Sequence, residues 1–443
     1  MSLKRYETYK PSCAEWLGDV PSHWTVRRLG YYFAERREKV SDKVFQPLSV
    51  TKAGIVPQLE TAAKTDDGDN RKRVCRGDFV INSRSDRKGS SGVSALDGSV
   101  SLINTVLAPE KEVLGAFVHH LLRSVDFQEE FYRYGKGIVA DLWSTNYSEM
   151  KNISFPNPPL HEQAAIVAFI DREAAKIDAL VEGQRRLIAL LKEKRQAVIS
   201  YAVTNGLDPN APMKDSGVEW LGKVPAHWRV VPARRLIAAV EQGWSPECEA
   251  ENAESGQWGV LKAGCVNWGV FRENENKALP KTLEAVASLE VKLGDVLVSR
   301  ANGSPELVGS TAFVSKSRPL LMLSDKIFRV HTKSLCDSQY FVLLFNSVSI
   351  RSQILQTISG AEGLANNLPQ ASLKAFACVL PPIREQRAIV TSLNQTTPRI
   401  DSLVAEAESA IALLQERRAA LISAAVTGKI DVRGLAPAAA EAA

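Results

Sequence analysis

The sequence contains one tryptophan-rich phrase twice. EWLGDVPSHW runs from Glu15 to Trp24, and EWLGKVPAHW runs from Glu219 to Trp228, an offset of 204 positions. A second repeat pairs PPLHEQAAIV at Pro158 with PPIREQRAIV at Pro381, an offset of 223, and continues to the phrases AVTNG and AVTGK. The segments between the repeats differ in length and sequence. Repeats of this kind predict two similar halves, each with a variable insert.

Composition limits the class of protein that the chain can be. Its 443 residues suffice for two or three domains, and its 45% hydrophobic and 24% charged residues are those of an ordinary globular protein. No apolar run approaches the roughly eighteen residues of a membrane span. The N-terminal MSLKRYETYKPSC lacks the apolar core of a secretory signal, so a cytoplasmic location is expected. The six scattered cysteines form no C-x-x-C pair, so neither a zinc site nor a disulfide framework is expected.

Long helices are predicted at the end of each half, because apolar residues recur there at steps of three and four. The expected packing seam consists of Ile177, Leu180, Leu187 and Leu191 in the first half, and of Ile400, Leu403, Leu414 and Leu421 in the second. Two such helices lying antiparallel would act as spacers between the inserts. Pro398 is expected to mark a helix start, or a kink if the helix continues.

The net charge of +5 is modest for this length, so it does not by itself indicate a nucleic-acid partner. The positions of the charges in the inserts are more informative. RGDFVINSR at Arg76 and LGDVLVSR at Leu293 each predict a short buried strand after a Gly-Asp turn. Seven basic residues and two acidic ones lie between Arg71 and Ser90, a pattern that suits phosphate neutralisation and guanine recognition. The alternative is a solvated loop or strand edge. The predicted DNA contacts are Arg71, Lys72, Arg73, Arg84, Arg87, Lys88 and Lys136 in the first insert, and Arg300, Asn302, Lys316, Arg318 and Lys326 in the second.

The repeated tryptophans have an apolar body and one N–H donor each. Trp16, Trp24, Trp220 and Trp228 are spaced around a Gly and a Pro, so we expect them to pack where each insert meets its helix. Base stacking is the less favoured alternative.

Together these motifs resemble a known family. K-x-S-x-x-EWLG-x-VP-x-HW before a variable domain, followed by PP-x-x-EQ-x-x-I and a helix ending in A-V-T-x-G, is similar to the specificity subunit of type I restriction-modification systems. The resemblance covers nearly the whole chain, twice. It implies a mixed α/β fold with a pseudo-two-fold repeat, in which two target-recognition domains are separated by two long antiparallel coiled-coil helices. The expected segments are recognition domains at 1–157 and 208–380, spacer helices at 158–207 and 381–430, and a disordered Ala-rich tail at 431–443.

The resemblance also implies a function and partners. A specificity subunit reads a bipartite, asymmetric site in double-stranded DNA and directs adenine methylation or restriction by other subunits. The implied partners are two modification subunits and the restriction, or translocase, subunits. S-adenosylmethionine, ATP and Mg²⁺ belong to those partners, so neither a cofactor nor a metal site is expected in this chain, and no membrane is involved.

Two alternatives are a self-contained methyltransferase or nuclease and a purely structural coiled-coil protein. NPPL at Asn157 resembles the N-P-P-aromatic motif of amino-methylating enzymes, but Leu160 has no ring to stack on a flipped base, and the counterpart at Leu380 reads LPPI. HEQAA at His161 lacks the second histidine of a zinc protease, and Glu290-Val-Lys292 is a chance-level match to a nuclease pair. No catalytic residue is predicted, and the dissimilar basic inserts disfavour a purely structural role.

Overall fold

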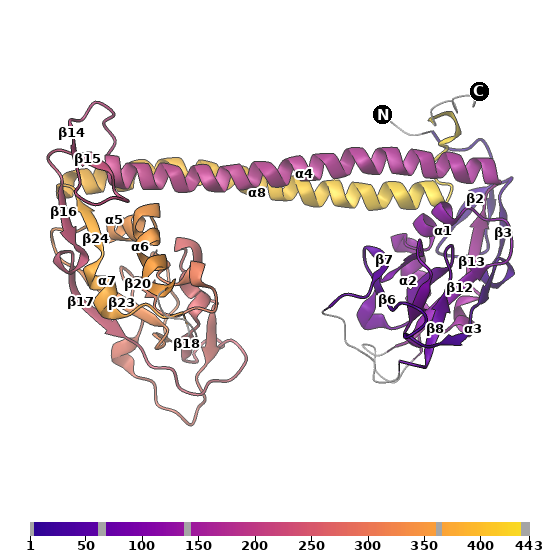
Figure 1. Cartoon of the computed structure of the whole chain (residues 1–443), viewed down its shortest axis with the longest axis horizontal. Helices are drawn as coiled ribbons and strands as arrows, with labels where there is room; N and C mark the ends of the chain where they lie inside the picture. The colour runs from indigo at the N-terminus through magenta and orange to yellow at the C-terminus, as the bar shows by residue number, and fades with distance from the viewer. Residues whose placement is uncertain (1–3, 61–67, 137–142, 360–365, 436–443) are drawn as a thin grey trace. The chain divides into compact units, whose positions relative to one another are not determined.

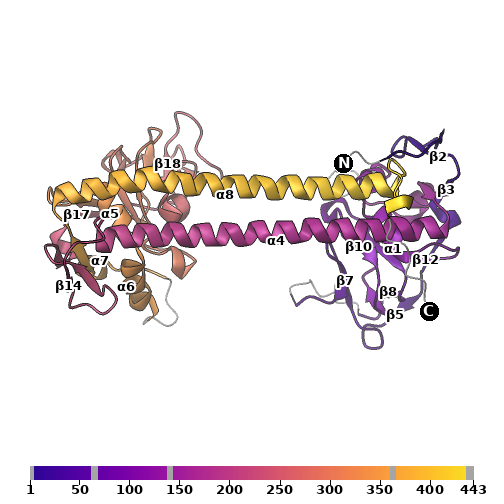
Figure 2. The same ribbon diagram turned by 90° about the horizontal axis from the view of Figure 1, so that it is seen from above.

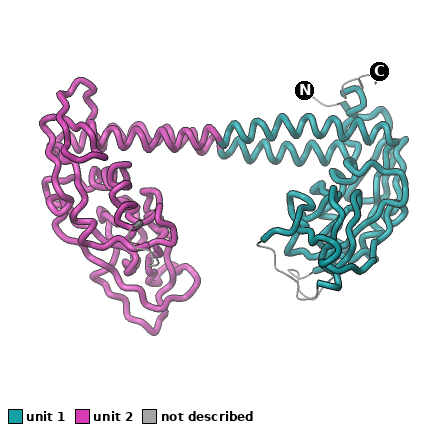
Figure 3. Tube along the Cα trace, in the orientation of Figure 1, with its two compact units in different colours: residues 1–185, 408–443 teal, residues 186–407 magenta. Residues whose placement is uncertain are grey.

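The computed structural model describes residues 4–60, 68–136, 143–359 and 366–435. The chain forms two compact units, which we call unit 1 (residues 1–185 and 408–443) and unit 2 (residues 186–407), shown in Figure 3. Helices α4 (Leu160–Asn205) and α8 (Ile383–Val426) each contribute residues to both units. No helix formed by these described stretches is both long and apolar enough to cross a membrane.

Unit 1 is built on several small, mostly antiparallel sheets with short helices beside them (Figure 1). The largest sheet has the order β10-β9-β12-β4, from Ser91–Val93, Phe79–Asn82, Asn104–Pro109 and Phe33–Glu35. A second sheet, β11-β8-β5, joins Gly98–Val100, Arg71–Val74 and Lys39–Val40. Three strand pairs are β1-β2 (Tyr9–Pro11, Asp19–Pro21), β13-β3 (Ser154–Asn157, Thr25–Arg28) and β6-β7 (Leu48–Thr51, Gly54–Pro57). The helices are α1 (Gly115–Leu121), α2 (Val125–Arg133) and α3 (Tyr147–Met150).

Unit 2 repeats this plan with different strand lengths. Its largest sheet, β17-β23-β20-β21, joins Ile237–Gln242, Ile327–Thr332, Val296–Ser299 and Thr311–Phe313. The sheet β19-β18-β22 joins Asn276–Ala278, Gly259–Leu261 and Leu321–Met322. The strand pairs are β14-β15 (Met213–Asp215, Lys223–Pro225) and β16-β24 (Arg229–Pro232, Ala377–Leu380). The helices are α5 (Ser338–Phe345), α6 (Val348–Ser359) and α7 (Gln370–Ala375).

The predicted buried strands after the Gly-Asp turns are confirmed. All four residues of β9 and all four of β20 are buried, as continuous apolar runs require. Gly77 and Gly294 have φ values of +92° and +91°, which suit glycine at the turn before each strand. The carboxylates of Asp78 and Asp295 accept hydrogen bonds from the backbone N–H groups of Cys75 (2.8 Å) and Lys292 (2.9 Å). The two inserts therefore share this element despite their different sequences.

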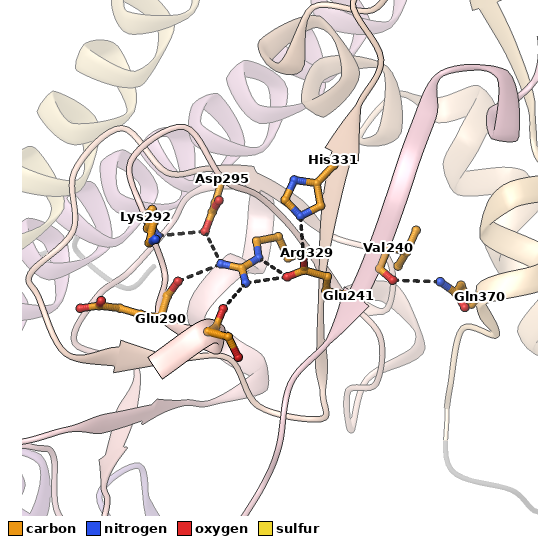
Figure 4. A network of polar contacts seen from close by, with 9 residues as sticks. Val240, Glu241, Glu290, Lys292, Asp295, Arg329, His331 and Gln370 are labelled. Atoms are coloured by element: carbon orange, nitrogen blue, oxygen red, sulfur yellow. Dashed lines mark hydrogen bonds and ion pairs between the residues drawn. The ribbon is translucent and has the colours of Figure 1, made fainter. Parts of the chain in front are cut away.

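A buried arginine holds the unit 2 turn in place (Figure 4). The guanidinium of Arg329 on β23 donates to Glu241 Oε2 at 2.6 and 2.8 Å, to Asp295 Oδ2 at 3.2 Å and to the Glu290 carbonyl oxygen at 2.8 Å. In unit 1, Arg36 donates to both oxygens of Asp78 in the same way, at 2.7 and 3.0 Å. These charged, multiply hydrogen-bonded pairs fix the start of each buried strand.

In each unit the glutamate of one repeated phrase binds side chains of the other, and we call this glutamate together with the side chains that bind it the clasp. In unit 1, Glu162 accepts hydrogen bonds from Trp24 Nε1 (3.0 Å) and the Tyr6 hydroxyl (2.5 Å), and it pairs with His23 Nε2 (2.7 Å). In unit 2, Glu385 accepts from Trp228 Nε1 at 2.8 Å and pairs with the histidine that precedes it, His227, at 2.8 Å. The glutamate of PP-x-x-EQ thus binds the histidine and tryptophan of VP-x-HW, which explains why the chain repeats both phrases.

The glutamine of the same motif ties the insert to the helix. Gln163 Oε1 accepts from the Leu114 N–H (2.8 Å) and its Nε2 donates to Asn157 Oδ1 (2.9 Å). In unit 2, Gln386 Oε1 accepts from the Asp337 N–H (2.8 Å). These glutamines therefore position the helices α1 and α5 that follow the bonded N–H groups.

The tryptophans behave largely as expected. Trp24 and Trp228 are fully buried, and the ring of Trp16 lies edge-on to Phe127 at 5.8 Å. Packing at the junction is therefore confirmed for these three. Trp220 differs, because 43% of it is exposed.

In each unit a stretch of α4 lies antiparallel to a stretch of α8, as both views show (Figures 1 and 2). The prediction of long paired helices is confirmed. Arg418 and Asp178 form an ion pair of 3.1 Å in unit 1, and Arg195 and Asp401 form one of 2.8 Å in unit 2. Asp401 corresponds to Asp178, and Arg418 corresponds to Arg195, each at the offset of 223. The repeat therefore extends to the contacts between the helices.

The predicted seam is partly wrong. Ile177 and Ile400 are buried and Leu191, Leu414 and Leu421 are half-buried, but Leu180, Leu187 and Leu403 are 56%, 44% and 48% exposed. The covered positions follow strict alternating steps of four and three; they are Ala174, Ile177, Val181, Gln184, Ile188 and Leu191 on α4, and Thr397, Ile400, Val404, Ala407, Ile411 and Leu414 on α8. The error arises because neighbouring apolar residues, such as Leu180 and Val181, satisfy either register.

Pro398 lies inside α8, so it neither starts the helix nor ends it. The ring is exposed on the solvent side, and the hydroxyls of Thr396 and Thr397 donate to the carbonyls of Ser392 and Leu393 at 2.9 Å each. A proline on an exposed face interrupts one backbone hydrogen bond without disturbing the packed face. The expectation of a start at this residue is corrected to a start at Ile383.

The segment after α8 is folded where a disordered tail was expected from residue 431. Asp431 donates its backbone N–H to the Lys4 carbonyl at 2.8 Å, and Arg433 pairs with the Asp431 carboxylate at 2.7 Å. The remaining tail, 436–443, lies outside the described residues.

Replacing the clasp glutamates should have unequal effects. The Glu162 side chain is 1% exposed and the Glu385 side chain 43%, so Glu162→Ala leaves buried donors unpaired whereas water reaches the equivalent site. We expect Glu162→Ala to cost about 3–5 kcal/mol and Glu385→Ala about 1–2 kcal/mol of local stability. Amide hydrogen exchange at each junction measures both effects, and equal losses would contradict this account.

The corrected seam predicts opposite outcomes at adjacent residues. Val181→Asp places a carboxylate in the covered seam and should lower the stability of the chain by about 3 kcal/mol or more. Leu180→Asp, the matched control, lies on the exposed face and should change it by less than about 0.5 kcal/mol. Urea unfolding of the two variants provides the measurement. A larger loss for Leu180→Asp would restore the register predicted from sequence.

Candidate nucleic-acid interface

Unit 1 brings part of the predicted basic set together beyond the end of β9. We call these residues, Arg84, Arg87, Lys88 and Lys136, the unit 1 group. Arg84 and Lys136 both pair through their backbones with Ser144, and the Ser85 N–H donates to the Trp143 carbonyl at 2.9 Å. Arg84, Arg87 and Lys88 are exposed, and the Lys136 side chain is 78% exposed. Arg87, Lys88 and Lys136 have acidic neighbours at the surface, Asp86, Glu129 and Glu149. Such pairs are weak, so these cations can exchange them for phosphates.

The predicted residues on β8 lie in a different environment. Arg71 is 5% exposed, and its guanidinium donates to Ser99 Oγ at 2.9 Å and to the Ser99 carbonyl at 3.1 Å. Burial lowers the pKa of this guanidinium. Lys72 is bound to Glu35 at 3.0 Å with 15% of its side chain exposed, and Arg73 pairs with Glu38 at 2.9 Å. Arg71 and Lys72 support the sheet instead of facing solvent, so we leave them out of the proposed interface.

In unit 2, Arg300, Asn302 and Lys326 lie beyond the end of β20, and we call these three residues the unit 2 group. The Arg300 N–H donates to the Lys326 carbonyl at 2.7 Å, and the Arg300 guanidinium donates to the Asp325 carbonyl at 3.1 Å. Ala301 pairs with Asn367 just as Arg84 pairs with Ser144 in unit 1. The two groups therefore occupy equivalent places, at the end of the same buried strand.

The other predicted residues of unit 2 lie apart from this group. Arg318 has a structural role, because its guanidinium donates to the carbonyls of Glu254 (2.9 Å) and Gln257 (3.2 Å). Lys316 is exposed on the segment after β21. We therefore retain Lys316 as a predicted contact and leave Arg318 out.

A basic cavity adjoins the unit 2 group. Lys262, Lys277 and Lys326 line a cavity of about 240 Å³, together with Ser324. Lys262 is bound to Asn252 Oδ1 at 3.1 Å, and Lys326 lies 3.4 Å from Asp325. A concave site with three cationic side chains suits a phosphate group.

Exposed aromatic residues complete both groups. Trp143 is 38% exposed beside Arg84, and Trp268 is 66% exposed with a positive φ of 61°. Asn267, the neighbour of Trp268, accepts a hydrogen bond from Asn302 Nδ2 at 3.3 Å. Sequence reasoning predicted Lys326 but missed both tryptophans, Lys262 and Lys277, because these four residues are far in sequence from the basic stretches.

The motifs weighed as catalytic have structural partners. Asn157 of NPPL accepts from Gln163 at the start of α4, and Glu290 Oε1 accepts from the Leu320 N–H at 2.9 Å. Both side chains support the backbone around them.

The fold defines a class of protein in which two mixed α/β units of unlike sequence share one repeated junction and a pair of long antiparallel helices. A solved structure from a study of complex assembly and conformational transition in the type I R-M system has this fold, with a TM-score of 0.65, 17% identity and coverage of 92% of this chain and 98% of the other. No family profile matches the sequence.

Curated relatives carry one description. The type I restriction enzyme EcoKI specificity subunit of Escherichia coli K12 is 24% identical over 82% of this chain and 76% of its own length. The EcoEI specificity subunit of Escherichia coli is 29% identical over 52% of this chain, a match that spans 38% of that relative. The StySPI specificity subunit of Salmonella potsdam is 23% identical over 82% of this chain and 76% of its own length. The chain is a homologue of the specificity subunits of type I restriction enzymes, and the resemblance inferred from the motifs is confirmed.

Removing exposed cations from the unit 1 group should lower the affinity for DNA and make that affinity less dependent on salt concentration. In the combined variant Arg84→Ala, Arg87→Ala, Lys136→Ala, the slope of log affinity against log salt concentration should fall by about 0.9 for each phosphate that these cations neutralise. A matched variant replaces three other exposed cations of unit 1, Arg28, Lys111 and Lys151. Fluorescence anisotropy over a salt series distinguishes the two. Equal slopes for both variants would show that the unit 1 group is ordinary solvated surface.

Proposed function

We propose that this chain is the DNA sequence-recognition subunit of a type I restriction-modification complex. The observation that carries the proposal is a contrast within one chain. The glutamate, histidine and tryptophan of the clasp and the ion pairs between the long helices recur in both units. The groups beyond β9 and β20 differ: they are Arg84, Arg87, Lys88 and Lys136 in one unit, and Arg300, Asn302 and Lys326 in the other. Two unlike reading surfaces on a repeated frame suit a site with two unlike halves.

The side chains in these groups suit both parts of DNA recognition. Lysine and arginine neutralise phosphates and set the position of the protein on the duplex. Arginine and asparagine also form paired hydrogen bonds with guanine and adenine in the major groove, so Arg84, Arg300 and Asn302 are the proposed base readers. Trp143 and Trp268 offer apolar surface for contact with a base or sugar.

The proposed complex contains modification and restriction subunits, since the matched structure comes from a type I R-M system and the relatives are specificity subunits. The number of two modification subunits for each copy of this chain is what the family resemblance implies. In this proposal the partners bind S-adenosylmethionine, ATP and Mg²⁺ and carry out the chemistry, and this chain contributes no catalytic group. The complex acts on chromosomal DNA in the cytoplasm.

A purely structural role is the second candidate. It would account for the helix pair, but it gives no reason for exposed cations and tryptophans at equivalent places in both units.

The proposal predicts that methyl transfer requires a second subunit. The purified chain alone should transfer no methyl group from radiolabelled S-adenosylmethionine to DNA, and the chain mixed with the modification subunit of its own system should do so. The modification subunit without this chain is the control and should be inactive on the same DNA. Methyl transfer by the chain alone at the rate of the mixture would contradict the proposal.

A further inference from the structure

Unit 2 has a cavity beside its clasp. Its volume is about 250 Å³, and its lining includes Asp208, Trp228, His227 and Glu385. Glu385 accepts hydrogen bonds from His227 and Trp228, and 43% of its side chain remains exposed. Two carboxylates therefore border a space that has neither a lysine nor an arginine among its lining residues.

The corresponding place in unit 1 is filled by the chain itself. The Tyr6 hydroxyl donates to Glu162 at 2.5 Å, and the Arg433 guanidinium lies over the Tyr6 ring, 4.9 Å from its centroid. Arg433 also donates to both oxygens of Asp431, at 3.0 and 2.7 Å. As a result the Glu162 side chain is only 1% exposed. Unit 1 therefore shows what a filled clasp contains: an aromatic ring and an arginine.

The residues of the two sites correspond one to one. Asp208 is related to Asp431, and Asn210 to Arg433, by the offset of 223. The local geometry agrees, because Asn210 donates its N–H to Asp208 Oδ1 at 2.9 Å and Arg433 donates its N–H to Asp431 Oδ1 at 3.1 Å. Counted from the EWLG phrase, Asn210 also corresponds to Tyr6, at an offset of 204. Asn210, whose side chain is short and exposed, is therefore the counterpart of both Tyr6 and Arg433.

The segment that carries the cavity residues Leu207 and Asp208 also carries uncovered apolar side chains. Leu207, Met213 and Trp220 are 48%, 39% and 43% exposed. Their counterparts in unit 1 are partly buried against the core; they are Ile430, Tyr9 and Trp16. Exposed apolar side chains on one segment are typical of a surface that another protein covers.

We propose that this cavity receives an arginine side chain from a segment of the modification subunit, a partner that rests on the proposed function. A guanidinium can bond two carboxylates, and Asp208 and Glu385 both line this cavity. In unit 1 Arg433 bonds the carboxylate of Asp431, the counterpart of Asp208, and lies over the ring of Tyr6, which donates to Glu162. Apolar side chains of the same segment would cover Leu207, Met213 and Trp220. A second copy of this chain is the less suitable occupant, because its own Arg433 is already engaged.

The test fills the cavity with an arginine of this chain. Asn210→Arg restores the residue of unit 1 and should occupy the cavity, so the affinity for the purified modification subunit should fall about tenfold or more. Asn210→Gln, the matched control, adds length without charge and should stay within about twofold of the wild-type chain. Asp208→Asn removes one carboxylate, keeps an acceptor for the Asn210 N–H and should also weaken assembly. Surface plasmon resonance of the full chain with the modification subunit measures each affinity.

Three outcomes would overturn the inference or its basis. Assembly of Asn210→Arg with wild-type affinity would show that the cavity takes no partner side chain. Dimers of the wild-type chain alone that Asn210→Arg abolishes, measured by mass photometry, would assign the cavity to a second copy. A wild-type chain that does not bind the modification subunit at all would instead overturn the proposed function. Binding of the chain alone to DNA should be the same for all variants, which confirms that they are folded.

Discussion

The carboxylate at the start of each long helix is the constraint on which the rest of the structure depends. Glu162 and Glu385 each bind the indole N–H of a buried tryptophan that lies well over a hundred residues earlier in the chain. A buried acceptor that pairs with distant donors fixes the relation between the start of the helix and the base of its insert. Everything between the tryptophan and the glutamate can then vary, provided that it returns the chain to the same junction.

This arrangement separates the part of each unit that is constant from the part that differs. The glutamate, histidine and tryptophan of the clasp, the following glutamine and the ion pairs Asp178–Arg418 and Arg195–Asp401 recur in both copies. Two of the six seam positions differ, since Ala174 corresponds to Thr397 and Gln184 to Ala407. The inserts share the Gly-Asp turn and the sizes of their two main sheets, a four-stranded and a three-stranded one, and differ in sequence and strand length. Exposed side chains at the ends of β9 and β20 are free of packing requirements, so they can differ without loss of stability. A recognition subunit needs this division, because its target can change while its partners stay the same.

Much of the frame could be predicted from the sequence, because repeats and apolar periodicity are local signals. The two helices, the buried strands and the packing of Trp24 and Trp228 follow from them. The register of the seam could not be fixed, since Leu180 and Val181 are both apolar and only the partner helix distinguishes them. Arg71 was expected at the DNA and lies buried against Ser99, a residue 28 positions later on β11, so no local pattern indicates its partner. The exposed Trp268 belongs to a turn whose neighbours come from distant segments, and no local pattern indicates it.

The central claim is that each unit reads one half of a divided DNA site, and mapping methylated adenines in DNA exposed to the assembled complex tests it directly. The account predicts one asymmetric sequence with two unlike specific parts separated by unspecified bases. It also predicts that replacing Arg84 relaxes specificity in one part only, and that replacing Arg300 and Asn302 relaxes it in the other part only. A continuous recognition sequence, or a single unit 1 replacement that alters both parts, would contradict the account.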